Sequence, residues 1–125
     1  MKRHLLLYTV LFFISCSKGS SGEKDREAPV VVLHTPVNNQ VFTGGQNIMI
    51  AGTVTDNKYI KEIHIEITNL ATAAEYLHVH IHPAASSFSF NQAFAIQAGI
   101  SYKIRVIADD ASSNSAVSSA EIICN

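Results

Sequence analysis

The sequence predicts an all-β domain, and more narrowly an antiparallel β-sandwich of about seven or eight short strands. Three observations predict this class. Apolar and polar residues alternate with a period of two through most of the chain after residue 28, which is typical of strands with one buried face. Turn residues separate these segments at regular intervals. No segment longer than a few residues has a helical period, and apolar residues make up 47% of the 125-residue chain, enough for one core.

Each expected strand lies between turn or breaker residues. The expected strands cover residues 30–33, 41–42, 47–55, 60–68, 76–82, 88–96, 102–108 and 116–123. Their boundaries are marked by Thr35-Pro36, Asn38-Asn39, Gly44-Gly45, Asp56-Asn57-Lys58, Pro83 and Gly99, with polar loops at residues 69–74 and 109–115. The sequence contains no internal repeat, so we expect a single domain over residues 28–125.

The first fifteen residues have the layout of a secretory signal peptide. The basic residues Lys2 and Arg3 precede an apolar run over residues 5–14, which small Ser15 follows. The run is shorter than the roughly twenty residues that cross a bilayer. Residues 13–16, Phe-Ile-Ser-Cys, resemble the lipobox of bacterial lipoproteins, with Phe in place of the usual Leu. The resemblance implies cleavage before Cys16 and lipid on its thiol. The alternative is an ordinary secretory signal that contains a cysteine.

Residues 16–27 are expected to be the lipidated cysteine and a flexible polar tether, because they offer no apolar side chain to bury. We therefore expect a lipoprotein of the bacterial cell envelope, anchored by its lipid at the outer membrane or cell surface. A formal charge of −1 argues against a nucleic-acid partner. With Cys16 lipidated, Cys124 has no partner for an internal disulfide, so it is either an intermolecular link or a plain strand-end residue.

Parts of the domain resemble bacterial immunoglobulin-like modules. Residues 25–31, 35–39, 44–45 and 50–56, the last reading Ile-Ala-Gly-Thr-Val-Thr-Asp, are similar to the opening half of such modules. Residues 102–110, with Ser113 and Asn114, resemble the penultimate strand and last loop. One module behind a lipobox, with His-Val-His-Ile-His at residues 78–82, resembles an uncharacterised family of bacterial surface lipoproteins. The resemblance implies an immunoglobulin-like antiparallel β-sandwich and no mechanism.

The strongest candidate site is a set of histidines on one strand face. His78, His80 and His82 are two residues apart, so they project from the same side of their strand. Both apolar faces point to the core if Ile67, Ile65 and Ile63 pair with Leu77, Val79 and Ile81. The same register places Glu66, His64 and Glu62 opposite the three histidines. Imidazole is a ligand for zinc and copper, so these six residues are a candidate metal site. The alternative is a solvated strand face.

A second candidate site is acidic. In immunoglobulin-like sandwiches the N-terminal approach, one early loop and the last loop meet at one end of the domain. Here these segments carry Asp25, Glu27, Asp56, Asp109 and Asp110. Carboxylate oxygens are the ligands that calcium prefers, so the five residues are a candidate calcium site. The alternative is that the aspartates cap backbone amides in turns.

The sequence carries no signature of an enzyme. It has no Gly-x-Ser-x-Gly elbow, no phosphate-binding glycine loop and no His-Glu-x-x-His helix. We therefore expect a non-enzymatic, lipid-anchored binding or interaction module with a protein or glycan partner at the cell surface. The alternative function is a zinc- or copper-binding lipoprotein that uses the histidine face. A structural spacer or a subunit of a larger surface complex also fits the sequence.

Overall fold

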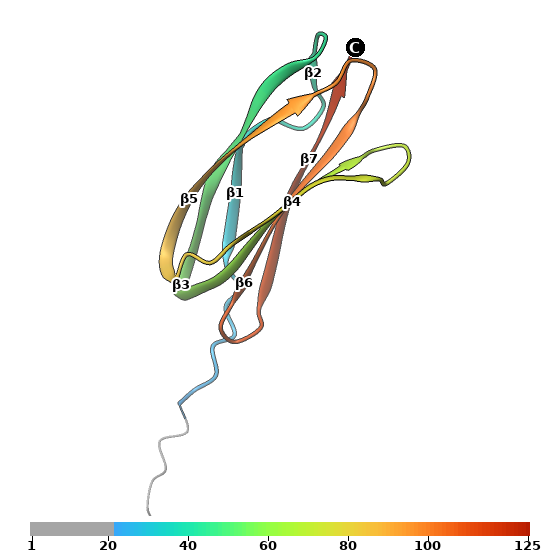
Figure 1. Cartoon of the computed structure of the whole chain (residues 1–125). Coiled ribbons are helices and arrows are strands. Elements are labelled where there is room, and N and C mark those ends of the chain that lie inside the picture. The colour runs from blue at the N-terminus through green and yellow to red at the C-terminus, as the bar shows by residue number, and fades with distance from the viewer. Residues whose placement is uncertain (1–21) are drawn as a thin grey trace, which may run out of the picture.

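The computed structural model describes residues 22–125, which form seven strands (Figure 1). The strands are β1 (Val30–Thr35), β2 (Gln40–Phe42), β3 (Gln46–Asn69), β4 (Glu75–Ile81), β5 (Ala85–Ile96), β6 (Tyr102–Asp110) and β7 (Ser115–Cys124). The all-β prediction is confirmed for this range. The expected signal peptide, Cys16 and the first part of the tether lie outside the described residues. Within residues 22–125, no helix has the length and hydropathy needed to cross a membrane.

Strand β3 organises the sheet. Its first half pairs with β1 on one side and β5 on the other, and its second half pairs with β6 and β4. We expected two strands here, separated by a turn at Asp56-Asn57-Lys58. Instead the chain bends here without reversing, with an irregularity in the pairing to β5 between Thr55 and Ile60. The Asp56 carboxylate accepts hydrogen bonds from the amides of Lys58 and Tyr59 at this bend. The two expected strands are therefore consecutive halves of one strand.

The strands form one mixed sheet in the order β1-β3-β6-β7-β2, with β4 and β5 also paired to β3. The expectation of a purely antiparallel sheet is wrong at one place, since β2 pairs with β7 in parallel. The short β2 follows β1 after the buried Pro36 and returns the chain to the far edge of the sheet, where its direction matches that of β7. All other pairings are antiparallel.

The sheet curls, so that one core collects side chains from both halves of β3 (Figure 1). In the second half, Ile63, Ile65 and Ile67 are fully buried while the residues between them face outward. Each buried isoleucine of this kind contributes about 2–3 kcal/mol of apolar burial. Cys124 is also buried, and its thiol donates a hydrogen bond to the Gly44 carbonyl, so it packs as a strand-end residue.

Candidate metal centre

The pairing of β3 with β4 sets the outer face on which the histidines lie. The register matches the one expected, with Ile67, Ile65 and Ile63 opposite Leu77, Val79 and Ile81. The residues between them must then share the outer face, since side chains alternate along a strand. Glu66 faces His78 and His64 faces His80 across the two strands. Burial of the isoleucines therefore determines which polar residues meet.

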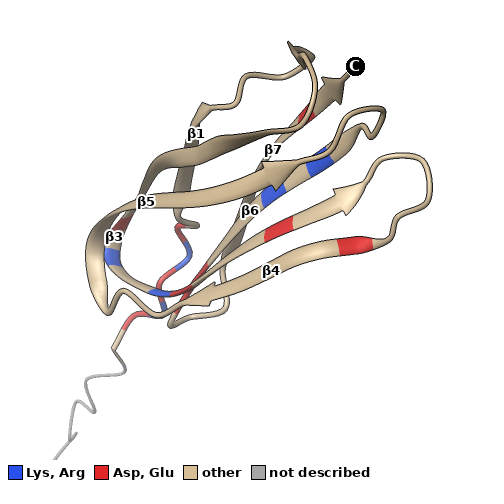
Figure 2. Ribbon diagram, turned by 45° about the horizontal axis from the view of Figure 1, so that its top comes forward, with Lys and Arg blue, Asp and Glu red and all other residues tan. Residues whose placement is uncertain are grey.

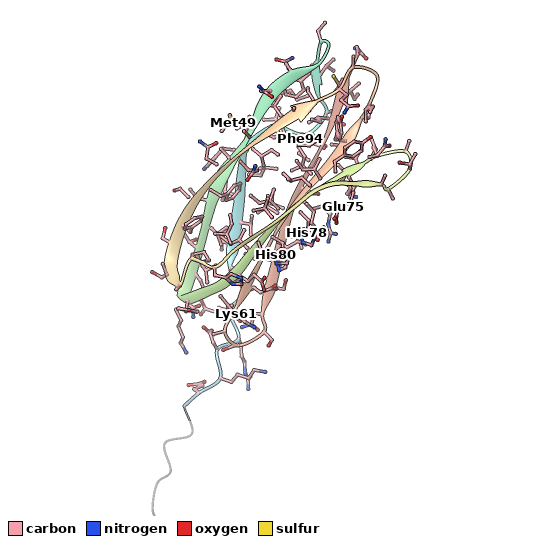
Figure 3. The ribbon with its side chains drawn as sticks, in the orientation of Figure 1. Met49, Lys61, Glu75, His78, His80 and Phe94 are labelled. Carbon is pink, nitrogen blue, oxygen red and sulfur yellow. The ribbon has the colours of Figure 1, made fainter. Side chains whose placement is uncertain are left out.

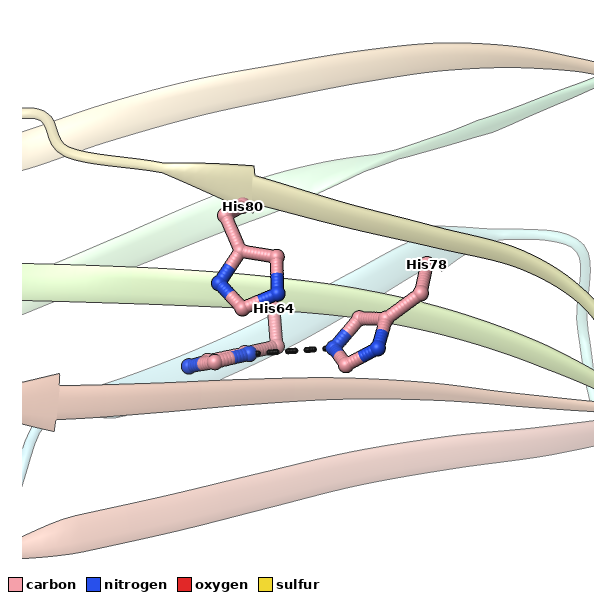
Figure 4. A group of neighbouring side chains, drawn as sticks. All are labelled: His64, His78 and His80. Carbon is pink, nitrogen blue, oxygen red and sulfur yellow. Dashed lines mark hydrogen bonds between the residues drawn. The ribbon is translucent and has the colours of Figure 1, made fainter.

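Three imidazole rings converge at this place. His78 and His80 project from the same side of β4, with Glu75 nearby (Figure 3). The rings of these two histidines turn toward His64 of β3 (Figure 4). His64 Nδ1 lies 3.2 Å from His78 Nε2. The ring centroids of His64 and His80 are 4.3 Å apart, and those of His78 and His80 are 4.4 Å apart. One nitrogen from each ring lies within 4.8 Å of the other two.

Glu62 is the carboxylate at the centre of this face. His80 Nδ1 donates a hydrogen bond to Glu62 Oε1 over 2.8 Å. The same oxygen lies 3.4 Å from His64 Nε2 and 3.8 Å from His82 Nε2. The hydrogen bond from His80 is the main reason that the pKa of Glu62 lies below its ordinary value, and the neighbouring histidines add to the shift. Glu62 therefore orients His80 and stays ionised.

Glu66 has a different neighbour. Its Oε2 accepts a hydrogen bond from Arg105 of β6 over 2.9 Å, while its Oε1 lies 3.7 Å from His78 Nε2. Arg105 was not predicted to belong to the site, although its place in the alternation of residues 102–108 puts it on the outer face. On the other side of His78, Nδ1 lies 3.5 Å from Glu75 Oε2. Glu66 is thus already paired with a cation, which makes it the weakest candidate ligand of the six.

The sequence was compared with protein families and with curated proteins. A domain of unknown function, DUF4625, matches residues 14–123. The chain belongs to the DUF4625 family. The match includes all seven strands except the last residue of β7, so the fold and the histidine face described above are those of a DUF4625 domain. No curated protein matches the chain.

The DUF4625 domain does not bring its five candidate calcium ligands together. Within residues 22–125, the groups of histidine, cysteine or acidic side chains close enough to share an ion contain none of Asp25, Glu27, Asp56 and Asp110. Asp109 belongs to such a group, but on the outer face, where its Oδ2 lies 4.0 Å from His64 Nε2. Successive residues of a strand face opposite sides, which separates Asp109 from Asp110.

Asp25 and Asp110 have structural partners instead. Asn114 donates from its side-chain amide to Asp110 Oδ2 and to the backbone carbonyls of Asp25 and Glu27. The other oxygen of Asp110 accepts from the amides of Ser112 and Asn114. Burial acts to raise the pKa of Asp110, but these hydrogen bonds outweigh it and the net shift is downward. The hydrogen bond from Asn57 is the main cause of the lowered pKa of Asp25.

These bonds attach the segment before β1 to the domain. Acidic and basic residues alternate along this segment (Figure 2). Asp25 is 8% exposed, although we expected residues up to 27 to belong to a flexible tether. The role of Asn114 was not predicted either, because this amide lies in a polar loop and two of its partners, Asp25 and Glu27, are almost ninety residues away in sequence. The contacts of the folded part therefore begin at Asp25.

Proposed function

We propose that this protein is a lipid-anchored binding domain of the bacterial cell envelope and that its ligand is a transition-metal ion, zinc or copper. The observation that carries the proposal is the convergence of one ring nitrogen from each of His64, His78 and His80 within 4.8 Å. Imidazole nitrogen is a favoured ligand of both metals. Three protein ligands leave a fourth position for water or another donor. An exposed site of this kind suits an ion that is taken up and released.

The spacing of the rings supports this proposal. Two ligand atoms bound to one tetrahedral zinc ion at about 2.0–2.1 Å lie about 3.3–3.4 Å apart. His64 Nδ1 and His78 Nε2 are 3.2 Å apart. An ion would therefore need only a small widening of this pair, which two side chains on the sheet surface can supply by rotation.

The carboxylates around the rings favour the correct tautomers. A metal-bound histidine usually donates its other ring N–H to a carboxylate or carbonyl, which fixes the ring and strengthens the ligand. Glu62 accepts from His80 Nδ1, and Glu75 lies beside His78 Nδ1. Both rings then keep Nε2 as the nitrogen that binds. Two neighbouring strands backed by a buried core hold these groups more rigidly than loops would.

We also propose that the curled sheet is an immunoglobulin-like sandwich. In this interpretation β1, the first half of β3 and β5 form one layer, and β4, the second half of β3, β6, β7 and β2 form the other. The pairing of each half of β3 with separate neighbours supports it. Lipid on Cys16 would anchor this domain, with the chain up to Asp25 as the connection to the membrane.

The proposed role is binding and not catalysis. The sequence has no recognisable nucleophile motif, and an ion held by three histidines needs no further machinery in order to be captured. An interaction module for a protein or glycan partner is the alternative, and it predicts no specific role for the histidines.

The test is a titration of the full chain, purified in detergent micelles, with Zn²⁺ and with Cu²⁺ by calorimetry. The variant carries His78→Ala and His80→Ala. The matched control is His34→Ala, which removes an exposed imidazole from β1. We expect tight, stoichiometric binding in the wild type and in the control, and a loss of at least about a thousandfold in the double variant, because a zinc ligand contributes roughly 3 kcal/mol.

Weak binding of equal strength in all three proteins would overturn the proposal. The interaction module would then be the better interpretation, and a pull-down from cell-envelope extracts would be the next experiment. Circular dichroism of each variant checks that the strands are retained. We expect no change, since His34, His78 and His80 project from the sheet and not into the core.

A further inference from the structure

The second nitrogen of His64 faces another group of potential ligands. His64 Nε2 lies 3.4 Å from Glu62 Oε1 and 4.0 Å from Asp109 Oδ2. His64, Glu62 and Asp109 offer one ligand atom each, all within 4.8 Å of one another. His64 Nδ1, on the opposite side of the ring, is the atom that faces His78. The two ring nitrogens therefore point into two separate groups of donors.

We propose that the histidine face holds two metal ions that share His64 as a bridging ligand. The proposal rests on the function proposed above and adds a second ion to it. The first ion would bind His64 Nδ1, His78 and His80. The second would bind His64 Nε2, Glu62 and Asp109. Its chemistry is that of a divalent ion that accepts both nitrogen and oxygen, for which zinc is the best candidate.

The position of β3 between two other strands makes this arrangement possible. The second half of β3 pairs with β4 on one side and β6 on the other. His64 therefore receives histidines from β4 and an aspartate from β6. In the register of β3 with β6, Glu62 pairs with Asp109.

The distances fit a second ion. Ligand atoms bound to zinc at about 2.0–2.2 Å lie roughly 3.3–3.6 Å apart in a tetrahedron. The separation of His64 Nε2 and Glu62 Oε1 is within that range, and Asp109 must approach by a few tenths of an ångström. Its side chain is 35% exposed, and within residues 22–125 His64 is its one ion-pair partner, so it is free to move.

Glu62 can accept the hydrogen bond from His80 and bind the second ion at the same time. A carboxylate has about four lone-pair positions on its two oxygens. Oε1 accepts from His80, and the remaining positions are available for a metal ion. His82 Nε2 lies 3.8 Å from the same oxygen. It could therefore be a fourth ligand of the second ion, which the other three residues leave with one open position.

The proton balance of the bridge is simple. A neutral imidazole carries one N–H, and when the first ion binds Nδ1 that proton resides on Nε2, toward the two carboxylates. Binding of the second ion to Nε2 replaces this proton, which is released to solvent, and the ring becomes an imidazolate. Metal binding that releases a proton is stronger at higher pH. The second ion should therefore bind more tightly as pH rises.

The test uses the full chain in detergent and compares wild type with Asp109→Asn. The matched control is Glu121→Gln, which removes a carboxylate from the same face of the sheet on β7. Zinc titration by calorimetry should give two ions per chain for wild type and Glu121→Gln. It should give one ion for Asp109→Asn, with the affinity of the first ion retained. One zinc ion in all three proteins would overturn the second site and leave the proposed function intact. No binding in any protein would overturn both.

A copper titration followed by electron paramagnetic resonance tests the shared ring. Two Cu²⁺ ions bridged by one imidazolate couple their unpaired spins. In wild type we expect the signal to grow with the first equivalent and to fall with the second. In Asp109→Asn the second equivalent should add no coupled species. A signal that grows in proportion to both equivalents in wild type would show two ions without a common ligand, and would contradict the bridge.

Discussion

Asp110 and His64 lie on neighbouring strands of one sheet, but their polar atoms differ in how far the chain itself supplies their hydrogen-bond partners. Both oxygens of Asp110 accept hydrogen bonds, all of them from Ser112 and Asn114 in the loop that follows. At His64 one ring nitrogen faces a nitrogen of His78, and only one proton can lie between them. The other faces carboxylates, which accept but do not donate.

The difference distinguishes a structural cluster from the cluster that we propose to bind metal. A buried polar group whose partners all come from the chain has little capacity left for a ligand, and its loss destabilises the fold. A cluster in which two imidazole nitrogens face each other, beside carboxylates, can take up something from outside the chain, a proton or a metal ion. Asp25, Asp110 and Asn114 are of the first kind, and His64, His78 and His80 are of the second.

The largest expected effect is a difference in the free energy of unfolding between substitutions of two adjacent aspartates. Asp110→Ala removes three hydrogen bonds at a residue that is 2% exposed, so the free energy of unfolding should fall by about 3 kcal/mol. Asp109→Ala removes an outward carboxylate, and should change that free energy by less than about 0.5 kcal/mol. Urea denaturation measures both. Equal losses would show that the two clusters do not differ in the way described.

The next effect concerns the carboxylate that orients His80. Glu62→Ala should lower the zinc affinity of the first ion by about 10–100-fold, the usual cost of losing a partner that orients a metal-bound histidine. The free energy of unfolding should change little, because the side chain lies on the outer face. Calorimetry and urea denaturation on the same samples separate the two results. An unchanged affinity would mean that Glu62 does not control the tautomer of His80.

A smaller effect is expected on acid stability. The pKa of Asp110 is lowered in the folded state, although burial alone would raise it, because the hydrogen bonds favour the ionised form. Its carboxylate thus stabilises the fold above the ordinary value of 3.8, and this contribution is lost as pH falls through the lower folded value. The unfolding free energy should decline over this acid range in wild type and decline less in Asp110→Asn. Thermal melts at several pH values measure it, and parallel profiles would refute the assignment.

The smallest effect is expected from Glu75→Gln. Its carboxylate lies 3.5 Å from His78 Nδ1, but the side chain is 58% exposed. Exposed ion pairs contribute about 0.2–1 kcal/mol, so zinc affinity should fall by no more than about fivefold. Calorimetry can resolve this against Glu62→Ala. A loss as large as that of Glu62→Ala would show that zinc binding by His78 depends on its exposed carboxylate as much as zinc binding by His80 depends on Glu62.

The sequence was sufficient to predict the histidine face but not its surroundings. The strand pairing that joins His64 to His80 follows from burial, because only one register buries the isoleucines of β3 and the apolar residues of β4 together. The neighbours from β6 could not be predicted in the same way, since no alternation in one strand indicates which third strand lies beside it. Arg105 and Asp109 were therefore not connected with the histidines.

The structure differs from the prediction at two other places, the end of β6 and residues 56–58, and each difference has a local cause. The alternation of residues 102–108 places Asp109 outward and Asp110 inward if it is continued by two residues, whereas the polar residues 109–115 predict a loop. At residues 56–58 the turn signal is real, since the Asp56 carboxylate accepts hydrogen bonds from the amides of Lys58 and Tyr59. Such a signal indicates a bend and does not show whether the chain reverses.

Among residues 22–125, β4 pairs with one strand, the second half of β3. An ion bound by His64 from β3 and by His78 and His80 from β4 would act as a cross-link between an edge strand and the centre of the sheet. A ligand that binds only the closed arrangement suppresses local opening. Amide hydrogen exchange along β4 would then slow as zinc is added, so the exchange rate of this edge strand would report whether the ion is bound.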